Sequence, residues 1–274
     1  MAVRAWLSAI LILLSLPLVG ADSTYLKIGR VAFSQPERIL ISHNSLCLHI
    51  KKEVGLADFE MFLYESYEEL FERLKAGDVQ LAWLGTAFYA MLNEPDIEPI
   101  VRPLWIGRKS YRGQWFALKE NSMNSLQDLR GKRVAFVSPK SSSGYLFPKM
   151  LLEKRGILLE DLSEYSFLDK HSAVVASVLT RQFDAGASYV GIFQEKAFVE
   201  NANKFQVLEQ TDEISNEPIV VRSDFPKDLK EKLRNAFLSA QSSGAVSSIR
   251  NLTGFVRAIS SDYDAVRKLV ADDE

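Results

Sequence analysis

The 274-residue chain has a single cysteine and only three histidines. The lone Cys47 cannot form an intramolecular disulfide, and it cannot supply a thiolate metal cluster. The histidines are His43, His49 and His171. At most the first two can lie near one another, so we expect no metal centre. The nucleotide-binding loops G-x-x-x-x-G-K-[ST] and G-x-G-x-x-G are also missing, and we expect no cofactor.

An excess of charge of one sign is missing as well. The chain contains 33 Lys and Arg residues against 35 Asp and Glu residues, a formal net charge of −2. Affinity for nucleic acids comes largely from clustered lysine and arginine, so this balance argues against nucleic-acid binding as the main function. Apolar residues make up 47% of the chain and charged residues 25%, which excludes a disordered or fibrous protein.

The one long apolar run stands at the N-terminus. Arg4 precedes a run from Trp6 to Leu16, and small or modest side chains come before Asp22. The run is shorter than the roughly 20 residues that span a bilayer. It is therefore typical of a secretory signal peptide rather than of a permanent anchor, which is the alternative. We predict a cleavable signal peptide over residues 1–21 and a periplasmic mature protein.

From residue 25 onward, short β-rich segments alternate with amphipathic segments, as in parallel sheets covered by helices. The pattern predicts strands over 26–33, 59–63, 81–84, 114–119, 133–137, 165–168, 183–187 and 219–222. It predicts helices over 35–54, 66–76, 86–92, 125–131, 145–155 and 172–181, and a mostly helical remainder from Pro226. Two of the strands, near residues 79–84 and 183–187, have the same pattern after a helix, which indicates two similar α/β lobes.

A serine-rich turn joins a predicted buried strand to a predicted helix at residues 138–144 (SPKSSSG). Hydroxyls and backbone amides there would stand at the positive end of a helix dipole. Ser141, Ser142 and Ser143 are therefore candidate anion ligands. The alternative is that one serine caps the helix and the others fill the turn.

His171 follows a predicted strand and precedes Ser172, a candidate helix cap. Its imidazole would then stand at the carboxyl end of a sheet, where ligands bind in open α/β folds, although a lone histidine is more often structural. Ser143, His171 and Asp184 offer the residue types of a hydrolase triad. The G-x-S-x-G motif of α/β-hydrolases is absent, so we expect no enzyme.

Two tyrosines occur at the ends of predicted elements. Tyr67 lies in the capping box S-Y-E-E, where the Ser66 hydroxyl would accept from the Glu69 amide and the Glu69 carboxylate from the Ser66 amide. Tyr111 lies within the basic run 108–112, which we expect to be a solvated loop. A phenol can donate to an oxyanion, but packing is the simpler interpretation of each tyrosine.

Several stretches together resemble one family. Residues 66–85 (SYEELFERLKAGDVQLAWLG) resemble the first signature of the phosphate-, phosphite- and phosphonate-binding proteins of ABC transporters. Residues 128–137 (DLRGKRVAFV), continuing through the serine turn to Pro148, are similar to the family's central signature. The segments FDAGA at 183–187 and NEPIV at 216–220 follow in the family's order. The resemblance covers about residues 25–240.

This resemblance implies a two-lobed α/β fold of periplasmic binding proteins, type II-like, with the ligand in a hinged cleft between the lobes. Residues 22–112 would form the first part of lobe 1, and residues 113–217 would form lobe 2. Residues 218–274 would return to lobe 1 and end in helices. The ligand-binding residues implied by the match are Tyr67, Tyr111, Ser141, Ser142, Ser143, His171 and Glu217. A carboxylate at Glu217 would favour a protonated ligand oxygen or a ligand amine.

The implied function is extracytoplasmic capture of a small phosphorus oxyanion (phosphonate, phosphite or phosphate) for an ABC importer, with no bond made or broken. The expected partners are that oxyanion and the permease of the transporter, and a monomer suits docking on a permease. The alternative is a ligand-sensing module that acts in trans on a membrane sensor kinase.

Overall fold

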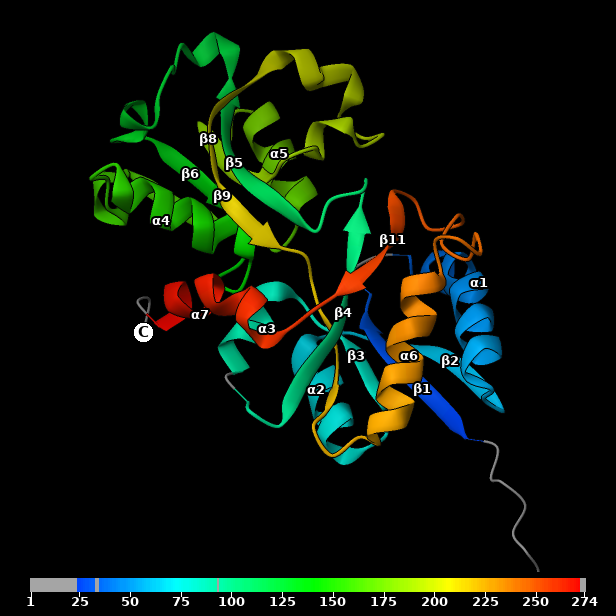
Figure 1. Ribbon diagram of the computed structural model, residues 1–274. Helices are drawn as coiled ribbons and strands as arrows, with labels where there is room; N and C mark the ends of the chain where they lie inside the picture. The colour runs from blue at the N-terminus through cyan, green and yellow to red at the C-terminus, as the bar shows by residue number, and fades with distance from the viewer. Residues whose placement is uncertain (1–23, 33–34, 93, 272–274) are drawn as a thin grey trace, which may run out of the picture.

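The computed structural model describes residues 24–32, 35–92 and 94–271. The predicted signal peptide over residues 1–21 lies outside this part of the chain. Within the described residues, no helix is both long and apolar enough to cross a membrane. The chain forms two lobes, each built on its own β-sheet (Figure 1).

Lobe 1 contains a six-stranded sheet in the order β11-β4-β10-β3-β1-β2. Its strands are β1 (Tyr25–Val31), β2 (Asp58–Tyr64), β3 (Leu81–Trp83), β4 (Ile97–Trp105), β10 (Ile219–Arg222) and β11 (Leu252–Arg257). Strand β1 is parallel to β2 and β3, whereas β10 is antiparallel to β3 and β4. One face packs against α1 (Pro36–Val54) and α6 (Lys227–Ser239). The other face packs against α2 (Tyr67–Ala76) and α3 (Thr86–Leu92).

Lobe 2 contains a five-stranded sheet in the order β7-β6-β8-β5-β9. Its strands are β5 (Ser110–Leu118), β6 (Arg133–Phe136), β7 (Glu164–Phe167), β8 (Ala185–Tyr189) and β9 (Phe205–Ser215). The helix α4 (Phe147–Lys154) covers one face and α5 (His171–Leu179) covers the other. Each sheet is thus buried on both sides, and the two-lobed α/β fold class predicted from the sequence is confirmed.

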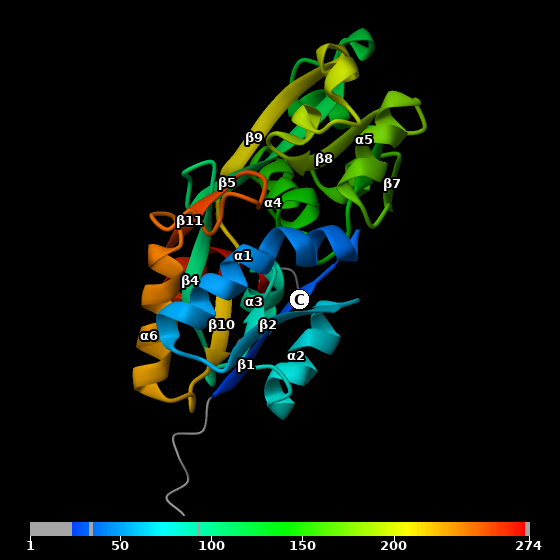
Figure 2. The ribbon, with the colours of Figure 1, turned by 90° about the vertical axis from the view of Figure 1, so that its right-hand side faces the viewer.

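The chain passes between the lobes twice, from β4 to β5 and from β9 to β10, and Figure 2 shows both passages in the middle of the molecule. Arg102 holds the second passage to lobe 1. Its guanidinium donates to Ser215 Oγ at 3.0 Å and to Asp262 Oδ1 at 2.9 Å. The Thr86 hydroxyl also donates to the Ser215 carbonyl at 2.8 Å. Two short connections of this kind allow a hinge motion that opens and closes the space between the lobes.

Helix α2 begins close to where the sequence predicts it. The Ser66 hydroxyl accepts from the Glu69 amide at 3.1 Å, as expected for its cap. The Glu69 carboxylate accepts from the amide of Glu65 at 3.3 Å, not from that of Ser66, so this half of the predicted capping box is wrong. The helix ends at Gly77, whose φ of 80° suits a residue without a side chain.

Three strands, β4, β9 and β11, were not predicted. Strand β4 contains Pro99 and Pro103, which cannot donate to a β-ladder and which discourage a strand prediction. Strand β11 contains Gly254 and contradicts the mostly helical remainder expected from Pro226. Both form strands because β4 pairs with β10 on one side and with β11 on the other. Such long-range pairing leaves little trace in local sequence.

Two further segments differ from expectation. Strand β5 begins at Ser110, so Tyr111 and Arg112 lie in a strand and not in the solvated loop that the basic run suggested. Helix α7 (Asp264–Ala271) packs against α3 of lobe 1, but its Val266 and Val270 belong to the hydrophobic cluster of lobe 2. The C-terminal helix therefore contacts both lobes.

Candidate functional site

A cavity of about 630 Å³ lies between the two lobes. We call this cavity the cleft. Lobe 1 lines it with the start of α2 and residues 85–88, and lobe 2 lines it with the serine turn, the start of α5 and the end of β8. Six of the seven predicted ligand-binding residues line it: Tyr67, Tyr111, Ser141, Ser142, Ser143 and His171. The seventh, Glu217, lines a smaller adjoining cavity.

The serine turn brings three hydroxyl groups to the cleft between β6 and α4. Ser141 Oγ accepts from the Gly144 amide at 3.1 Å, so this serine caps the single π-helical turn that leads into α4. Ser142 and Ser143 are only 6% and 3% exposed, yet both residues line the cleft. The capping interpretation therefore holds for Ser141, and Ser142 and Ser143 are placed to donate to a ligand.

Tyr111 reaches the same turn from β5. Burial raises the pKa of its phenol, and hydrogen bonding from the Ser143 and Ser142 hydroxyls opposes that rise. The phenol therefore stays protonated at neutral pH, and it joins the serines in one hydroxyl cluster. A hydroxyl cluster of this kind can donate to an anion without bringing a full positive charge.

His171 is the first residue of α5, and its ring lies against the Tyr189 ring with centroids 4.9 Å apart. Burial lowers the pKa of the imidazole to about 4, so it is neutral at pH 7. Its Nδ1 lies 2.8 Å from the hydroxyl of Ser188, a fully buried residue of β8. The Ser188 proton needs an acceptor, and Nδ1 provides one, which leaves the proton of the neutral ring on Nε2. His171 can then donate to an anion through Nε2.

Tyr67 opens α2 and stacks on Phe88 with ring centroids 5.3 Å apart. The backbone of Gly85 approaches the Tyr67 ring so closely that a Cβ at Gly85 would lie 2.8 Å from Cζ and 2.9 Å from the hydroxyl oxygen. A side chain at this position would displace the tyrosine. Glycine at position 85 thus keeps the phenol at the wall of the cleft.

The substitution Gly85→Ala is expected to weaken ligand binding by about 1–2 kcal/mol, because the new methyl group forces the Tyr67 ring out of its position. Isothermal titration calorimetry measures the effect, and thermal unfolding of the same variant serves as the control for global damage. An unchanged affinity in a well-folded variant would show that the ring position does not matter for binding.

The two lobes are also joined across the mouth of the cleft. The ammonium of Lys140, in the serine turn, donates to the carboxylate of Glu68 on α2. Both side chains are about half exposed, so this ion pair contributes little to stability, about 0–1 kcal/mol. Its position shows that the structure has the two lobes in contact around the cleft.

Glu217 lies behind the cleft and not in its wall. It lines a cavity of about 180 Å³, which we call the inner chamber, and its carboxylate accepts from Trp105 Nε1 at 3.0 Å. Burial raises the pKa of Glu217, and the positive charge of Arg30, which also lines the chamber, opposes that rise. The predicted acceptor therefore faces a cation of the protein itself.

Sequence reasoning missed Arg30, Lys140 and Ser188. Arg30 lies on β1, where it belongs to no motif, and Lys140 was noted only as part of the serine turn. Ser188 follows directly after the predicted strand over 183–187 and belongs to no motif. The two-residue period of β8 would have placed Ser188 on the same face as Gly186 had the strand been extended to Tyr189.

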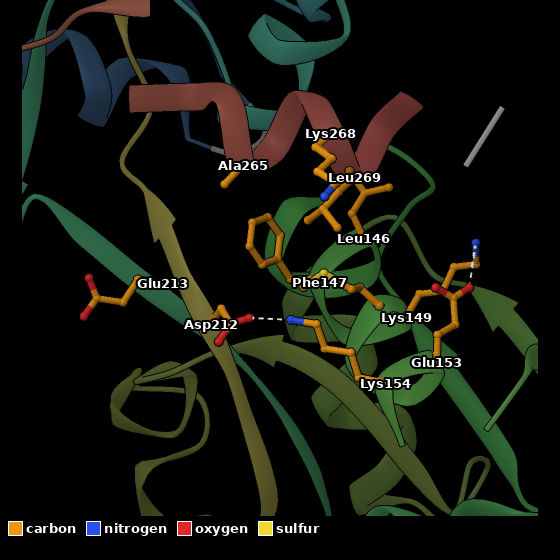
Figure 3. Close-up of a pocket in the computed structure, with 11 residues that line it drawn as sticks. Leu146, Phe147, Lys149, Glu153, Lys154, Asp212, Glu213, Ala265, Lys268 and Leu269 are labelled. Atoms are coloured by element: carbon orange, nitrogen blue, oxygen red, sulfur yellow. Dashed lines mark hydrogen bonds and ion pairs between the residues drawn. The ribbon is translucent and has the colours of Figure 1, made fainter. Parts of the chain in front are cut away.

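A groove of about 420 Å³ lies elsewhere, between α4, the end of β9 and α7 (Figure 3). Its floor is apolar, with Leu146, Phe147 and Leu269 pointing toward one another, and the Lys154–Asp212 ion pair crosses its rim at 2.7 Å. It contains none of the seven predicted ligand-binding residues and none of the hydroxyl cluster. The cleft is therefore the better candidate for an anion site.

Comparisons with known proteins agree with this choice. The family model described as phosphonate ABC transporter, periplasmic substrate-binding protein matches residues 28–263. The "Phosphate-import protein PhnD" of Mycolicibacterium smegmatis is 27% identical over 160 residues, which cover 54% of this chain and half of that protein. The "Probable ABC transporter phosphite binding protein PhnD1" of Prochlorococcus marinus is 21% identical over 92% of this chain and 90% of its own length.

A solved structure shares the fold. The structure of PhnD1 from Prochlorococcus marinus in complex with methylphosphonate has a TM-score of 0.75 and is 19% identical. The match covers 92% of this chain and 98% of that chain. At this level of identity the likeness concerns the fold, and it includes both lobes.

Two α/β lobes joined by two passages, with a ligand-sized cleft between them, define the class of periplasmic binding proteins. Within that class, the chain belongs to the periplasmic substrate-binding proteins of phosphonate ABC transporters. Membership of this family indicates an extracytoplasmic location. Proteins of this kind bind a ligand for a transporter and are not enzymes, as the sequence predicted.

Proposed function

We propose that the protein captures a small phosphorus oxyanion, such as a phosphonate, phosphite or phosphate, and delivers it as a monomer to the permease of an ABC importer. Export through the predicted signal peptide over residues 1–21 brings it to the periplasm. The observation that carries the proposal is the convergence of six candidate ligand-binding side chains on one cavity of about 630 Å³.

The chemistry of the cleft suits an anion with several acceptor oxygens. A tetrahedral phosphorus oxyanion offers three oxygens to donors on different sides. The serine hydroxyls and the Tyr111 phenol lie on one side, and His171 donates from α5. Neutral donors hold an anion without a permanent salt bridge, and closure of the lobes strengthens each hydrogen bond by excluding water.

Relatives support the ligand class but differ in the ligand they name. One relative is named for phosphate import and another for phosphite binding, and the solved neighbour contains methylphosphonate. All three compounds share a tetrahedral phosphorus with acceptor oxygens. We therefore propose the shared head group as the recognised feature. No observation favours the sensor-kinase alternative over transport.

Isothermal titration calorimetry with phosphite, phosphate, methylphosphonate and 2-aminoethylphosphonate tests the proposal. At least one of these compounds is expected to bind well below millimolar concentration, with sulfate, amino acids and sugars as comparison ligands. Binding of a comparison ligand, together with no binding of any phosphorus compound, would refute the proposed ligand class. Size-exclusion chromatography with light scattering checks the monomer.

A further inference from the structure

The inner chamber opens from the cleft. Tyr67, Gly85, Thr86 and Tyr111 line both cavities, so the two tyrosines stand between them. A ligand whose oxyanion lies at the serine turn can extend a substituent past the tyrosines into the chamber. The remaining lining residues of the chamber are Arg30, Val31, Trp83 and Glu217.

His43, a residue of α1, holds the Arg30 guanidinium in place. The ring of His43 donates from Nδ1 to the Ile39 carbonyl at 2.8 Å, so its Nε2 carries a lone pair. That Nε2 lies 2.5 Å from Arg30 Nη1 and accepts from it. The guanidinium also stacks over the Trp83 ring, 4.3 Å from its centroid. The described residues give the guanidinium no further hydrogen bond, so its other N–H groups are available to the chamber.

Glu217 lines the same chamber as Arg30. The two groups influence each other electrostatically but form no ion pair within 4.0 Å in the described part of the chain. Trp83 also lines the chamber and is only 2% exposed. Its indole Nε1 makes no hydrogen bond of full geometry, but its hydrogen-bonding interaction with the Glu217 carboxylate lowers the pKa of that group. Two half-buried groups of opposite charge thus line one small cavity.

We propose that the inner chamber binds a ligand substituent that carries an anionic and a cationic group together, as in the α-amino-acid end of an amino-phosphonocarboxylic acid. The carboxylate of such a substituent accepts from Arg30, and its ammonium donates to Glu217. This inference rests on the proposed function, because the cleft must first hold the phosphorus head group.

Other substituents satisfy the chamber less well. A substituent with only an ammonium is attracted to Glu217 but repelled by Arg30. A substituent with only a carboxylate is attracted to Arg30 but repelled by Glu217. An apolar substituent displaces water from both charged groups and offers neither of them a new partner. A substituent with both charges places each of them next to the opposite charge of the protein. Arg30 is then a specificity-determining residue, because its positive charge disfavours simple aminoalkyl phosphonates.

Four probes with the same head group test this inference by calorimetry: methylphosphonate, 2-aminoethylphosphonate, phosphonoacetate and 2-amino-3-phosphonopropionate. The wild-type protein is expected to bind 2-amino-3-phosphonopropionate at least about tenfold more tightly than either singly charged substituent, as for one added charge-assisted hydrogen bond. Methylphosphonate, which does not reach the chamber, reports on the cleft itself.

Two variants assign the preference to the chamber. In Arg30→Met, the ratio of affinities for 2-amino-3-phosphonopropionate and 2-aminoethylphosphonate is expected to fall about tenfold. In the nearly isosteric Glu217→Gln, the ratio of affinities for 2-amino-3-phosphonopropionate and phosphonoacetate is expected to fall by a similar factor. If Arg30→Met does not fold, Glu217→Gln alone provides the test. Arg257→Met is the matched control, because Arg257 is an exposed residue whose partner is Glu231 at 3.1 Å.

The outcomes separate the two proposals. If methylphosphonate binds but the wild-type protein shows no preference for the doubly charged substituent, the inference is wrong and the proposed function stands. Ratios that stay unchanged in both chamber variants also overturn the inference, since Arg30 and Glu217 then only neutralise each other. If no phosphorus compound binds, the proposed function fails and the inference fails with it.

Discussion

Replacing Ser142 or His171 with alanine is expected to weaken binding of the preferred phosphorus oxyanion by about 1–3 kcal/mol each, which is roughly 5- to 150-fold. Both side chains line the cleft, and under the proposed function each substitution removes one donor to a negatively charged oxygen. Such hydrogen bonds would form in a closed cleft, where water would not fully replace the lost donor. Calorimetry with the best ligand found among phosphite, phosphate and the phosphonates measures the change.

Matched controls keep this test specific. Ser242→Ala removes an exposed hydroxyl that donates only to the Ser239 carbonyl at 2.9 Å. His49→Gln replaces a histidine whose Nε2 lies 2.9 Å from the Ala236 carbonyl, within lobe 1. Both controls are expected to bind as the wild-type protein does. Unchanged affinity in Ser142→Ala and in His171→Ala would dismiss the cleft as the ligand site.

Acid is expected to destabilise the fold through His43, which is buried, and His171, which is half-buried. Burial lowers the pKa of His171 to about 4, and burial together with the charge of Arg30 lowers that of His43 to about 4. Above pH 6.5 both rings are neutral in the folded and in the unfolded chain. Between pH 6.5 and 4 only the unfolded chain takes up the protons, so the free energy of unfolding falls as the pH is lowered. The loss is about 3 kcal/mol per histidine at pH 4.

Urea unfolding at pH 7.5 and at pH 4.5 measures this effect. Between these two pH values the free energy of unfolding is expected to fall by about 2–3 kcal/mol more in the wild-type protein than in His43→Gln or His171→Gln. The reason is that each variant lacks one of the two titrating histidines. The control variant Ser242→Ala, which removes no titratable group, should follow the wild-type curve. Equal losses in all four proteins would mean that the two imidazoles are not held neutral by the fold.

The same protonation state bears on ligand binding. A neutral His171 with a pKa of about 4 does not change its charge between pH 5 and 8. Over this range the ligand-free protein therefore keeps His171 neutral, and the ligand meets an uncharged donor. The hydroxyl groups of Ser142, Ser143 and Tyr111 also keep their protons in this range, since burial raises the pKa of the Tyr111 phenol.

Local signals predicted the helices and turns well. Gly55 and Gly77 end α1 and α2 with positive φ values of 77° and 80°, and Ser66 caps α2. Each of these depends on a few neighbouring residues, so the sequence contains the whole cause. Strand β4 was missed because its two prolines oppose a strand locally. Its pairing partners β10 and β11 lie more than 100 residues further along the chain.

The candidate site divides in the same way. The serine turn could be recognised because a strand, a run of small polar residues and a helix follow one another directly. The environments of Glu217 and His171 could not be read from the sequence. Arg30 and Glu217 line one cavity because the end of β1 and the start of β10 both pair with β3 at Trp83.

The amino-acid sequence by itself determined the alternation of strands and helices, the caps, the hydroxyl-rich turn and the absence of disulfides and cysteine-based metal sites, since each of these follows from adjacent residues or from composition. Only the tertiary structure decided which donors share a cavity, that His171 is neutral with Ser188 at Nδ1, and that Arg30 opposes Glu217. Burial and charge pairing depend on groups brought together from distant parts of the chain, and their energies depend on distance and on the exclusion of water.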